Sequence, residues 1–169
     1  MLYREQDILD WARDRGLLEV KNRTKQALKT ATEVAELIEH SINGTDITDD
    51  IGDIYVTIVI QAYLNARTMQ RCLTEQFEIP EDYFKGGDST ELLVELHLAT
   101  SLMASETLDS AYDEYSSISE HIRSIYMIIN EICDQKDLSF KACVDLAYNE
   151  IKGRTGKLVN GVFVKDEKH

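Results

Sequence analysis

The sequence lacks the roughly 18 consecutive apolar residues that a membrane-spanning helix needs, and its amino-terminal segment lacks the apolar core of a signal peptide. Basic residues are also scarce, since 18 lysines and arginines stand against 31 aspartates and glutamates, which gives a formal charge of −13. Such a charge repels nucleic acids and anionic membranes at long range and attracts divalent cations. We therefore predict a cytoplasmic protein with no nucleic-acid partner and no membrane association.

Cysteine occurs only three times, at Cys72, Cys133 and Cys143. These residues form no Cys-x-x-Cys motif and have no paired histidines, so neither a disulfide framework nor a zinc site is predicted. They are typical of small buried side chains in a reducing compartment. A chain of 169 residues can bury a sufficient core without such cross-links, and a single domain is expected.

Proline occurs once, at Pro80, and apolar residues in the longer segments recur with helical rather than alternating spacing. The sequence therefore predicts an all-α helical bundle. The exception is KLVNGVFVK near the end, where Asn160-Gly161 between two β-branched runs predicts a short C-terminal β-hairpin. The expected helices cover residues 3–15, about 23–41, about 48–66 with Thr48 as N-cap, a short segment through Cys72, 89–102 behind an Asp88 or Ser89 cap, about 109–133, and 140–150 behind a Ser139 cap.

A weak internal repeat relates the segment that begins at Ile54 to the segment that begins at Ile125. The AEL of residues 35–37 and the VEL of residues 94–96 precede these segments in the same order. We interpret residues 1–169 as one domain with a first repeat at 1–77, a connection at 78–89, a degenerate second repeat at 90–155, and a hairpin and tail at 156–169. The aligned pairs are Ile54 with Ile125, Tyr55 with Tyr126, Ile58 with Ile129, Cys72 with Cys143, and Phe77 with Tyr148.

Two pairs of acidic residues at i, i+3 spacing occur in successive expected helices, Glu33 with Glu36 and Asp50 with Asp53. Each pair projects from one helix face. A chain this rich in acids should contain on the order of five such pairs by chance, mostly on solvated faces. The residues around each pair must therefore show whether the pair forms a site or lies on a solvated face.

The helix expected near 23–41 places Gln26, Lys29, Glu33 and Glu36 on one stripe, opposite an apolar face. A plain amphipathic surface helix shows the same pattern, and for this helix alone that interpretation is favoured. The acids of this helix are informative only in combination with those of the next.

The helix expected near 48–66 is apolar on nearly all sides and leaves a narrow polar stripe that includes Asp50 and Asp53. A helix of this kind should be buried. An ionised carboxylate at Asp53 would then cost several kcal/mol unless a cation or hydrogen bonds compensate. A metal ion is one interpretation; the alternatives are helix N-terminal stabilisation for Asp50 and a buried, hydrogen-bonded acid for Asp53.

If these two helices pack antiparallel across the turn at 43–47, the four carboxylates can converge on one point. Hard oxygen donors without histidine or cysteine select magnesium or manganese rather than zinc. A triphosphate would bridge such ions and would itself need positively charged side chains. The candidates are Lys152, Arg154 and Lys157. The alternative role for these three residues is capping of the helix C-terminus. Trp11 and Tyr148 could stack on a base, although a lone tryptophan in a helix is more often a core residue.

Glu-x-x-Glu, thirteen residues and Asp-x-x-Asp, within QALKTATEVAEL and DDIGDIYVTIVI, resemble the signature of all-α nucleoside triphosphate pyrophosphatases of the MazG type. The ending AYNEIKGRTGKLVNGVFVK is similar to that of small phage-type MazG-like proteins. Together with the opening WARDRGLL, these segments cover about half of the chain. The combination is far more specific than an acidic pair.

The resemblance implies hydrolysis of an NTP or dNTP to the monophosphate and diphosphate, with magnesium, or manganese in its place, and water attack on the α-phosphorus. It also implies a homo-oligomer, a dimer or tetramer, of helical subunits. Glu33 or Glu36 would orient or deprotonate the water. By the same resemblance, Glu33, Glu36, Asp50 and Asp53 would hold the metal, Lys29, Asn149, Lys152 and Arg154 would contact phosphates or sugar, and Trp11 would contact the base.

Two departures from the family pattern qualify these expectations. Asp50 stands where the family usually has glutamate, which could alter the metal geometry, and residues 78–120 are absent from short single-unit members. The second departure suggests a duplicated form that has lost the acids of one copy, since His121 and Ser124 lie opposite Asp50 and Asp53. The related dimeric dUTPases are similar in this respect, so a deoxypyrimidine-specific enzyme is an alternative. A non-enzymatic helical interaction module is the other.

Overall fold

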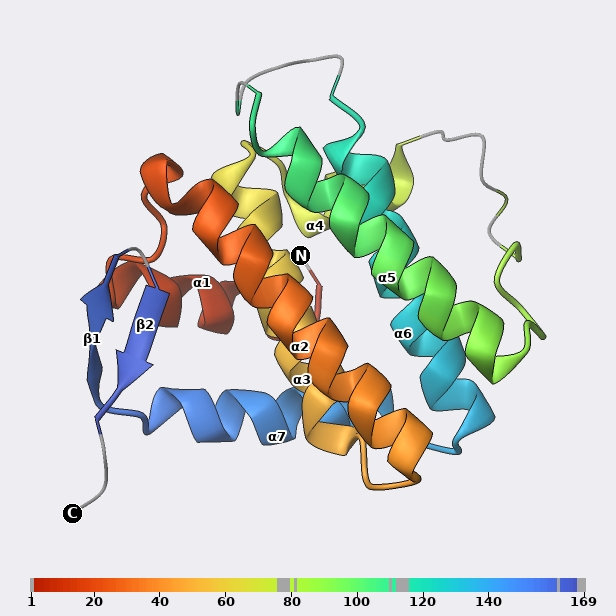
Figure 1. The fold of residues 1–169 in the computed structure, drawn as a ribbon. Helices are drawn as coiled ribbons and strands as arrows, with labels where there is room; N and C mark the ends of the chain where they lie inside the picture. Colours follow the sequence, from red (N-terminus) through yellow and green to blue (C-terminus); the bar gives the residue numbers. More distant parts are fainter. Residues whose placement is uncertain are drawn as a thin grey trace.

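The computed structural model describes residues 2–75, 80, 82–109, 111, 116–160 and 162–166, and most of them are helical (Figure 1). A short antiparallel hairpin follows the last helix and pairs Gly156 with Lys165 and Val159 with Val162. The expected all-α fold with a C-terminal hairpin is confirmed. The elements are α1 (Glu5–Asp14), the 3-10 turn η1 (Val20–Asn22), α2 (Arg23–Asn43), α3 (Thr48–Leu64), α4 (Met69–Thr74), α5 (Ser89–Glu106), α6 (Ile118–Gln135), α7 (Phe140–Lys152), β1 (Gly156–Val159) and β2 (Val162–Lys165).

Local side-chain chemistry sets several helix ends. Gly44 ends α2 in a left-handed conformation, with φ of 69°, which favours glycine. Asp88 forms a capping box with Glu91 at the start of α5, and Ser139 caps α7. Thr48 was expected to cap α3 but is its first residue. The N-cap residue is Ile47, and the Asp46 carboxylate before it accepts hydrogen bonds from both the backbone N–H and the hydroxyl of Thr48.

The helix expected to begin near residue 109 begins at Ile118, so this boundary was wrong. The Arg23 guanidinium donates hydrogen bonds to the carbonyl oxygens of Thr107 and Asp109, and these bonds hold the segment after α5 against the start of α2. The Ser116 hydroxyl donates to Glu106 and accepts from the N–H of Ile118. Serine side chains that bond nearby backbone in this way compete with helix formation. Residues 110 and 112–115 of the expected helix, and 76–79 and 81 around the expected connection, lie outside the described residues.

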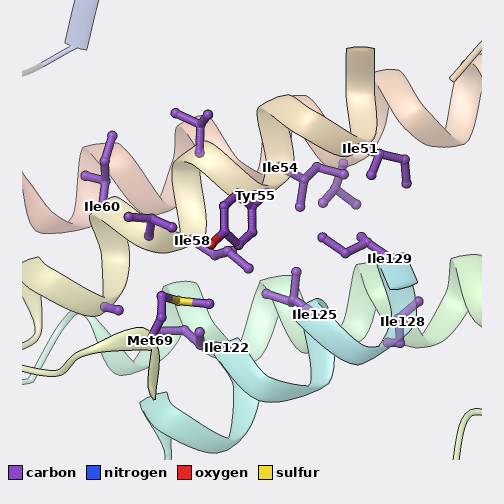
Figure 2. Packing of buried hydrophobic residues seen from close by; sticks show 14 of the residues in the cluster. Ile51, Ile54, Tyr55, Ile58, Ile60, Met69, Ile122, Ile125, Ile128 and Ile129 are labelled. Atoms are coloured by element: carbon purple, nitrogen blue, oxygen red, sulfur yellow. The ribbon is translucent and has the colours of Figure 1, made fainter. Parts of the chain in front are cut away.

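Helix α3 forms the centre of the fold and packs against α1, α2, α4, α6 and α7. Its residues Ile54, Tyr55 and Ile58 are fully buried, which confirms the expected burial of this helix. Figure 2 shows these side chains directed toward Ile125 and Ile129 of α6. The three cysteines are also buried and free, as expected. Within the described ranges, no helix combines the length and the apolar character that crossing a membrane would require.

Helix α7 crosses α3 at Gly52, where the two backbones approach closely. A Cβ atom at this position would lie 2.3 Å from the carbonyl oxygen of Cys143 and 2.7 Å from the Cβ of Ala147. Glycine at 52 and alanine at 147 therefore allow the close contact. The crossing brings the C-terminal end of α7 and the residues that follow it beside the first turns of α3.

The two helix pairs α2–α3 and α5–α6 each pack together, and they meet through contacts of α2 with α5 and of α3 with α6. The repeat interpretation assigns α1 to α4 to the first copy and α5 to α7 to the second. The duplication remains a prediction, and Phe77, one of the aligned residues, lies outside the described part of the chain.

Candidate functional site

A cavity of about 80 Å³ lies where α1, α2 and α3 meet the end of α7 and the hairpin. Figure 1 shows the hairpin, α1 and the C-terminal end of α7 on the same side of the molecule. One part of the lining is polar and the other is apolar, as in sites that bind a ligand with a polar part and an apolar part. The polar lining residues are Gln26, Lys29, Glu33, Asp53, Thr57 and Arg154, and the apolar ones are Trp11, Leu17, Val56, Ile60, Ile151 and Phe163.

Glu33 enters this cavity from α2 and is only 4% exposed, while Gln26, two turns earlier, is 3% exposed. The interpretation of the stripe as a solvated face is therefore wrong for Gln26 and Glu33, whereas Glu36 is exposed and Lys29 is partly buried. Periodicity identified the stripe but not what covers it, because α3 packs against α2 there. Lys29 lies one turn before Glu33 and forms an ion pair with its carboxylate.

Asp53 faces Glu33 across the cavity from α3. The pKa of Asp53 is raised to about 7, mainly by burial and in addition by the nearby charges of Glu33 and Asp49, while Arg154 and Lys29 act in the opposite direction. Burial also raises the pKa of Glu33, against the effect of Lys29. Burial therefore makes Asp53 costly to ionise despite the charges of Arg154 and Lys29, and a cation bound beside it would offset that cost.

Asp49 is a further acid beside this cavity that the sequence analysis missed. Its Oδ1 atom is buried and has no hydrogen-bond partner among the described residues. Burial raises the pKa of Asp49, and the charge of Glu150 on α7 adds to the shift. Asp49 and Asp53 are spaced i, i+4 and so share a helix face. The i, i+3 spacing of the predicted acidic pairs leaves Asp49 out, whereas i, i+4 spacing relates it to Asp53.

Asp50 and Glu36 do not join the pair at the cavity in this structure. Asp50 is buried, and its Oδ2 lies 2.7 Å from Nδ1 of His40 on α2. This hydrogen bond raises the pKa of His40. Glu36 is exposed on α2 and does not line the cavity. In the part of the chain that the structure describes, no group of three or more histidines, cysteines, aspartates and glutamates lies close enough to hold a metal ion.

The predicted phosphate contacts at the C-terminal end of α7 and just after it separate into two groups. Arg154 lines the cavity and donates a hydrogen bond of 2.6 Å to Glu150. Lys152 and Asn149 are exposed and bond each other at 2.6 Å, outside the cavity lining. Of the expected phosphate contacts, the cavity therefore brings together Lys29 and Arg154, and leaves Lys152 and Asn149 outside.

Trp11 forms part of the apolar wall of the cavity and is half-buried. Its position is therefore intermediate between that of a core residue and that of a residue exposed to a ligand. Its indole N–H donates to the carbonyl oxygen of Ile151, and its ring meets the edge of Phe163 at a centroid distance of 6.0 Å. Phe163 was not singled out in the sequence because nothing in the hairpin pattern indicates its partner. Tyr148, the other stacking candidate, does not line the cavity and lies against Arg4.

The acids at and beside the cavity, Glu33, Asp53 and Asp49, offer carboxylate oxygens only, and no histidine or cysteine lines the cavity. One Asp49 oxygen is buried without a hydrogen-bond partner, but no three of the acids in the described residues lie close enough together to form a metal site. Hard oxygen donors of this kind suit magnesium or manganese. Comparison of the chain with protein-family models, with curated proteins and with solved structures finds no match.

Proposed function

We propose that the protein is a magnesium-dependent nucleoside triphosphate pyrophosphohydrolase, which converts an NTP or dNTP to the monophosphate and diphosphate by water attack on the α-phosphorus. The observation that carries this proposal is the desolvated pair Glu33 and Asp53, which shares one cavity with two cations and an apolar wall. The Glu-x-x-Glu and Asp-x-x-Asp resemblance gives independent support. A ligand with an anionic tail and a flat ring matches this division of the lining.

Glu33 and Asp53 would hold magnesium, together with Glu36 and Asp50 by the motif and Asp49 by its position. Asp50 can keep its bond to His40, since that bond uses only Oδ2. When bound, magnesium would offset phosphate charge and lower the pKa of a coordinated water.

The chain's own groups would carry the other roles. Glu33 or Glu36 would orient the water and accept its proton. Lys29 and Arg154, at the cavity, would donate to phosphate oxygens, and Lys152 and Asn149, which lie outside, would reach the outer phosphates or sugar. The apolar wall around Trp11 would contact the base and exclude water.

A deoxypyrimidine substrate is the second candidate, because the loss of the acids at His121 and Ser124 resembles the degenerate copy of the dimeric dUTPases. Gln26 and Thr57 place polar side chains on the lining of the cavity, where they could meet the edge of a base. A dUTP- or dCTP-hydrolysing enzyme is therefore the narrower form of the same proposal.

The proposal is tested by measuring pyrophosphate release from a panel of NTPs and dNTPs, with and without magnesium. We expect release that requires magnesium, with the pyrimidine deoxynucleotides hydrolysed fastest if the narrower form holds. No release from any nucleotide, together with no thermal stabilisation by magnesium and nucleotide, would support the helical interaction module instead.

Arg154→Gln should raise KM for the nucleotide by about tenfold, because it removes one charge-assisted hydrogen bond to phosphate. The effect on kcat should be smaller, since the bond is present in the ground state as well. Steady-state kinetics at saturating magnesium would measure both. Lys136→Gln is the control for loss of a charge, as Lys136 is exposed at the end of α6 and absent from the cavity lining. Equal KM values for the two variants would contradict a phosphate role for Arg154.

A further inference from the structure

A second cavity, of about 330 Å³, is lined by residues of α5, of α6 and of the turn at residues 82–87 that precedes α5. It is larger than the first cavity and has room for a small organic molecule. In Figure 1, α5 and α6 lie side by side, on the opposite side of the molecule from the hairpin. The second cavity is therefore separate from the candidate site described above.

The aromatic wall of the second cavity is fixed by the fold. Phe84 is 6% exposed and belongs to the core, and its ring meets that of Tyr83 edge to face at a centroid distance of 4.9 Å. Two residues further on, the N–H of Gly86 donates a hydrogen bond of 3.0 Å to the Glu131 carboxylate of α6. The turn that carries the two rings is thus attached to α6, and the cavity is present without a bound ligand.

The polar groups of the second cavity can accept hydrogen bonds that the protein does not supply. Ser124 is 6% exposed, and its hydroxyl bonds none of the residues that the structure describes. Within the same ranges, the carboxylates of Glu95 and Glu120 also have no hydrogen-bond or ion-pair partner. Burial lowers the pKa of His121 against the nearby charge of Glu120, so the imidazole is neutral at neutral pH and one ring nitrogen can accept. A ligand that donates hydrogen bonds would satisfy these groups.

The charges of the lining select a cationic ligand. Among the described lining residues there is no lysine or arginine, so a phosphate or carboxylate would meet two glutamates without compensation. A metal ion is disfavoured too, because no three ligating side chains in the described ranges lie close enough to hold one. An organic cation needs no such convergent shell and donates N–H bonds. The ring of Tyr83, which is 61% exposed, would attract its charge, and Leu98 and Leu102 would contact its apolar part.

The repeat interpretation relates this cavity to the proposed metal site. The four polar lining residues stand opposite four acids of the first repeat. The aligned pairs are Glu36 with Glu95, Asp49 with Glu120, Asp50 with His121 and Asp53 with Ser124. By this alignment, two acids are replaced by a neutral imidazole and a hydroxyl. The replacement removes charge that a small divalent ion needs and keeps acceptors for a larger, singly charged cation.

We propose that the cavity between α5 and α6 is a second ligand site, which binds a small organic cation with an ammonium or amidinium group and an apolar body. The cationic group would lie near Glu95 and Glu120 and donate to Ser124. The apolar body would lie against Tyr83 and Leu98. The inference rests on α5, α6 and the turn before α5, and it does not depend on the proposed hydrolase activity.

Titration with benzamidine, followed by proton–nitrogen NMR spectra of labelled protein, tests the proposal. Benzamidine joins a flat ring to an amidinium cation, and benzoate is the matched control because it has a similar shape and the opposite charge. We expect benzamidine to saturate with a dissociation constant on the order of 1 mM, with the largest shifts at Leu98, Ala99 and Ser124, and benzoate to cause none. Lack of saturation, equal binding of benzoate, or shifts confined to Val56 and Ile60 of the first cavity would overturn the proposal.

Variants assign the binding to this cavity. Glu95→Gln and Glu120→Gln should each weaken benzamidine binding about tenfold, because each removes a charge and hardly changes the shape. Ser124→Ala should weaken it about threefold by removing one acceptor. Asp134→Asn is the matched control, as Asp134 is exposed on α6 and outside the lining. The spectra show whether each variant is folded, and equal dissociation constants for all four would exclude this site. Because no nucleotide is present, failure here is distinct from failure of the hydrolase proposal.

Discussion

Asp53→Asn should reduce pyrophosphate release by a factor of about 1,000 and at the same time stabilise the metal-free protein at neutral pH. The loss of activity follows because an amide cannot replace a carboxylate at the centre of the proposed site. The gain in stability follows because the pKa of Asp53 is raised to about 7, mainly by burial. Above that pH the native protein must hold a desolvated charge close to Glu33, and asparagine removes it.

The pH dependence has a definite sign. A carboxyl group whose pKa is higher in the folded than in the unfolded state favours folding only while it is protonated. Its contribution is complete below the unfolded pKa of about 4 and is lost as the pH rises through 7. A shift of this size corresponds to about 2–4 kcal/mol at pH 8 after allowance for partial solvation. We expect Asp53→Asn to recover about this amount there and little at pH 4.

Urea unfolding of the metal-free protein between pH 4 and pH 8 would measure this difference. Asp14→Asn serves as a control for loss of charge alone, because Asp14 is exposed at the end of α1. Added magnesium should stabilise the wild type more than Asp53→Asn. A variant with full activity would remove Asp53 from the site, and an unchanged pH profile of stability would show that its carboxyl group is well solvated.

Gly52→Ala should destabilise the protein by about 3 kcal/mol, although alanine is the better helix former by about 1 kcal/mol. The new methyl group would meet the carbonyl oxygen of Cys143 at 2.3 Å and the Cβ of Ala147 at 2.7 Å. Neither atom belongs to a flexible side chain that could move aside. Helices α3 and α7 would have to separate, and this would draw Arg154 away from Asp53.

The separation has a kinetic as well as a thermodynamic signature. In protein that remains folded, Gly52→Ala should raise KM for the nucleotide in the same direction as Arg154→Gln. Gly153→Ala is the matched control, because a Cβ at Gly153 would have no neighbour within 4 Å. Urea unfolding and steady-state kinetics of both variants would provide the comparison. A Gly52→Ala protein as stable as wild type would show that the helix crossing adapts without cost.

The helices were largely predictable because their signals are local. Gly44 ends α2, Asp88 and Ser139 cap α5 and α7, and the all-round apolar character of α3 indicates its central position. The start of α6 was missed because the Arg23 side chain, which takes the carbonyl oxygens of Thr107 and Asp109, comes from a helix distant in sequence. Local patterns do not contain such long-range contacts.

The site was predictable only in part, for a related reason. Periodicity places an acid on a helix face but does not identify the residue that it meets. Glu33 and Asp53 lie at one cavity as expected, whereas Asp50 bonds His40 and Asp49 lies beside the pair. Whether Asp49 or Asp50 lies beside Glu33 and Asp53 depends on how α3 is rotated about its axis relative to α2 and α7. That rotation is set by the packing of the whole core.

The position of Trp11 provides a means of observing the site directly. The chain has one tryptophan, and this residue forms part of the cavity wall between Ile151 and Phe163. Under excitation that tyrosine does not absorb, all of the intrinsic fluorescence of the protein therefore originates beside the proposed base-binding wall. A stacked base would quench this emission, and detachment of the hairpin would shift it to longer wavelength. The native protein thus carries a built-in reporter for titrating nucleotides and metal ions without any attached label.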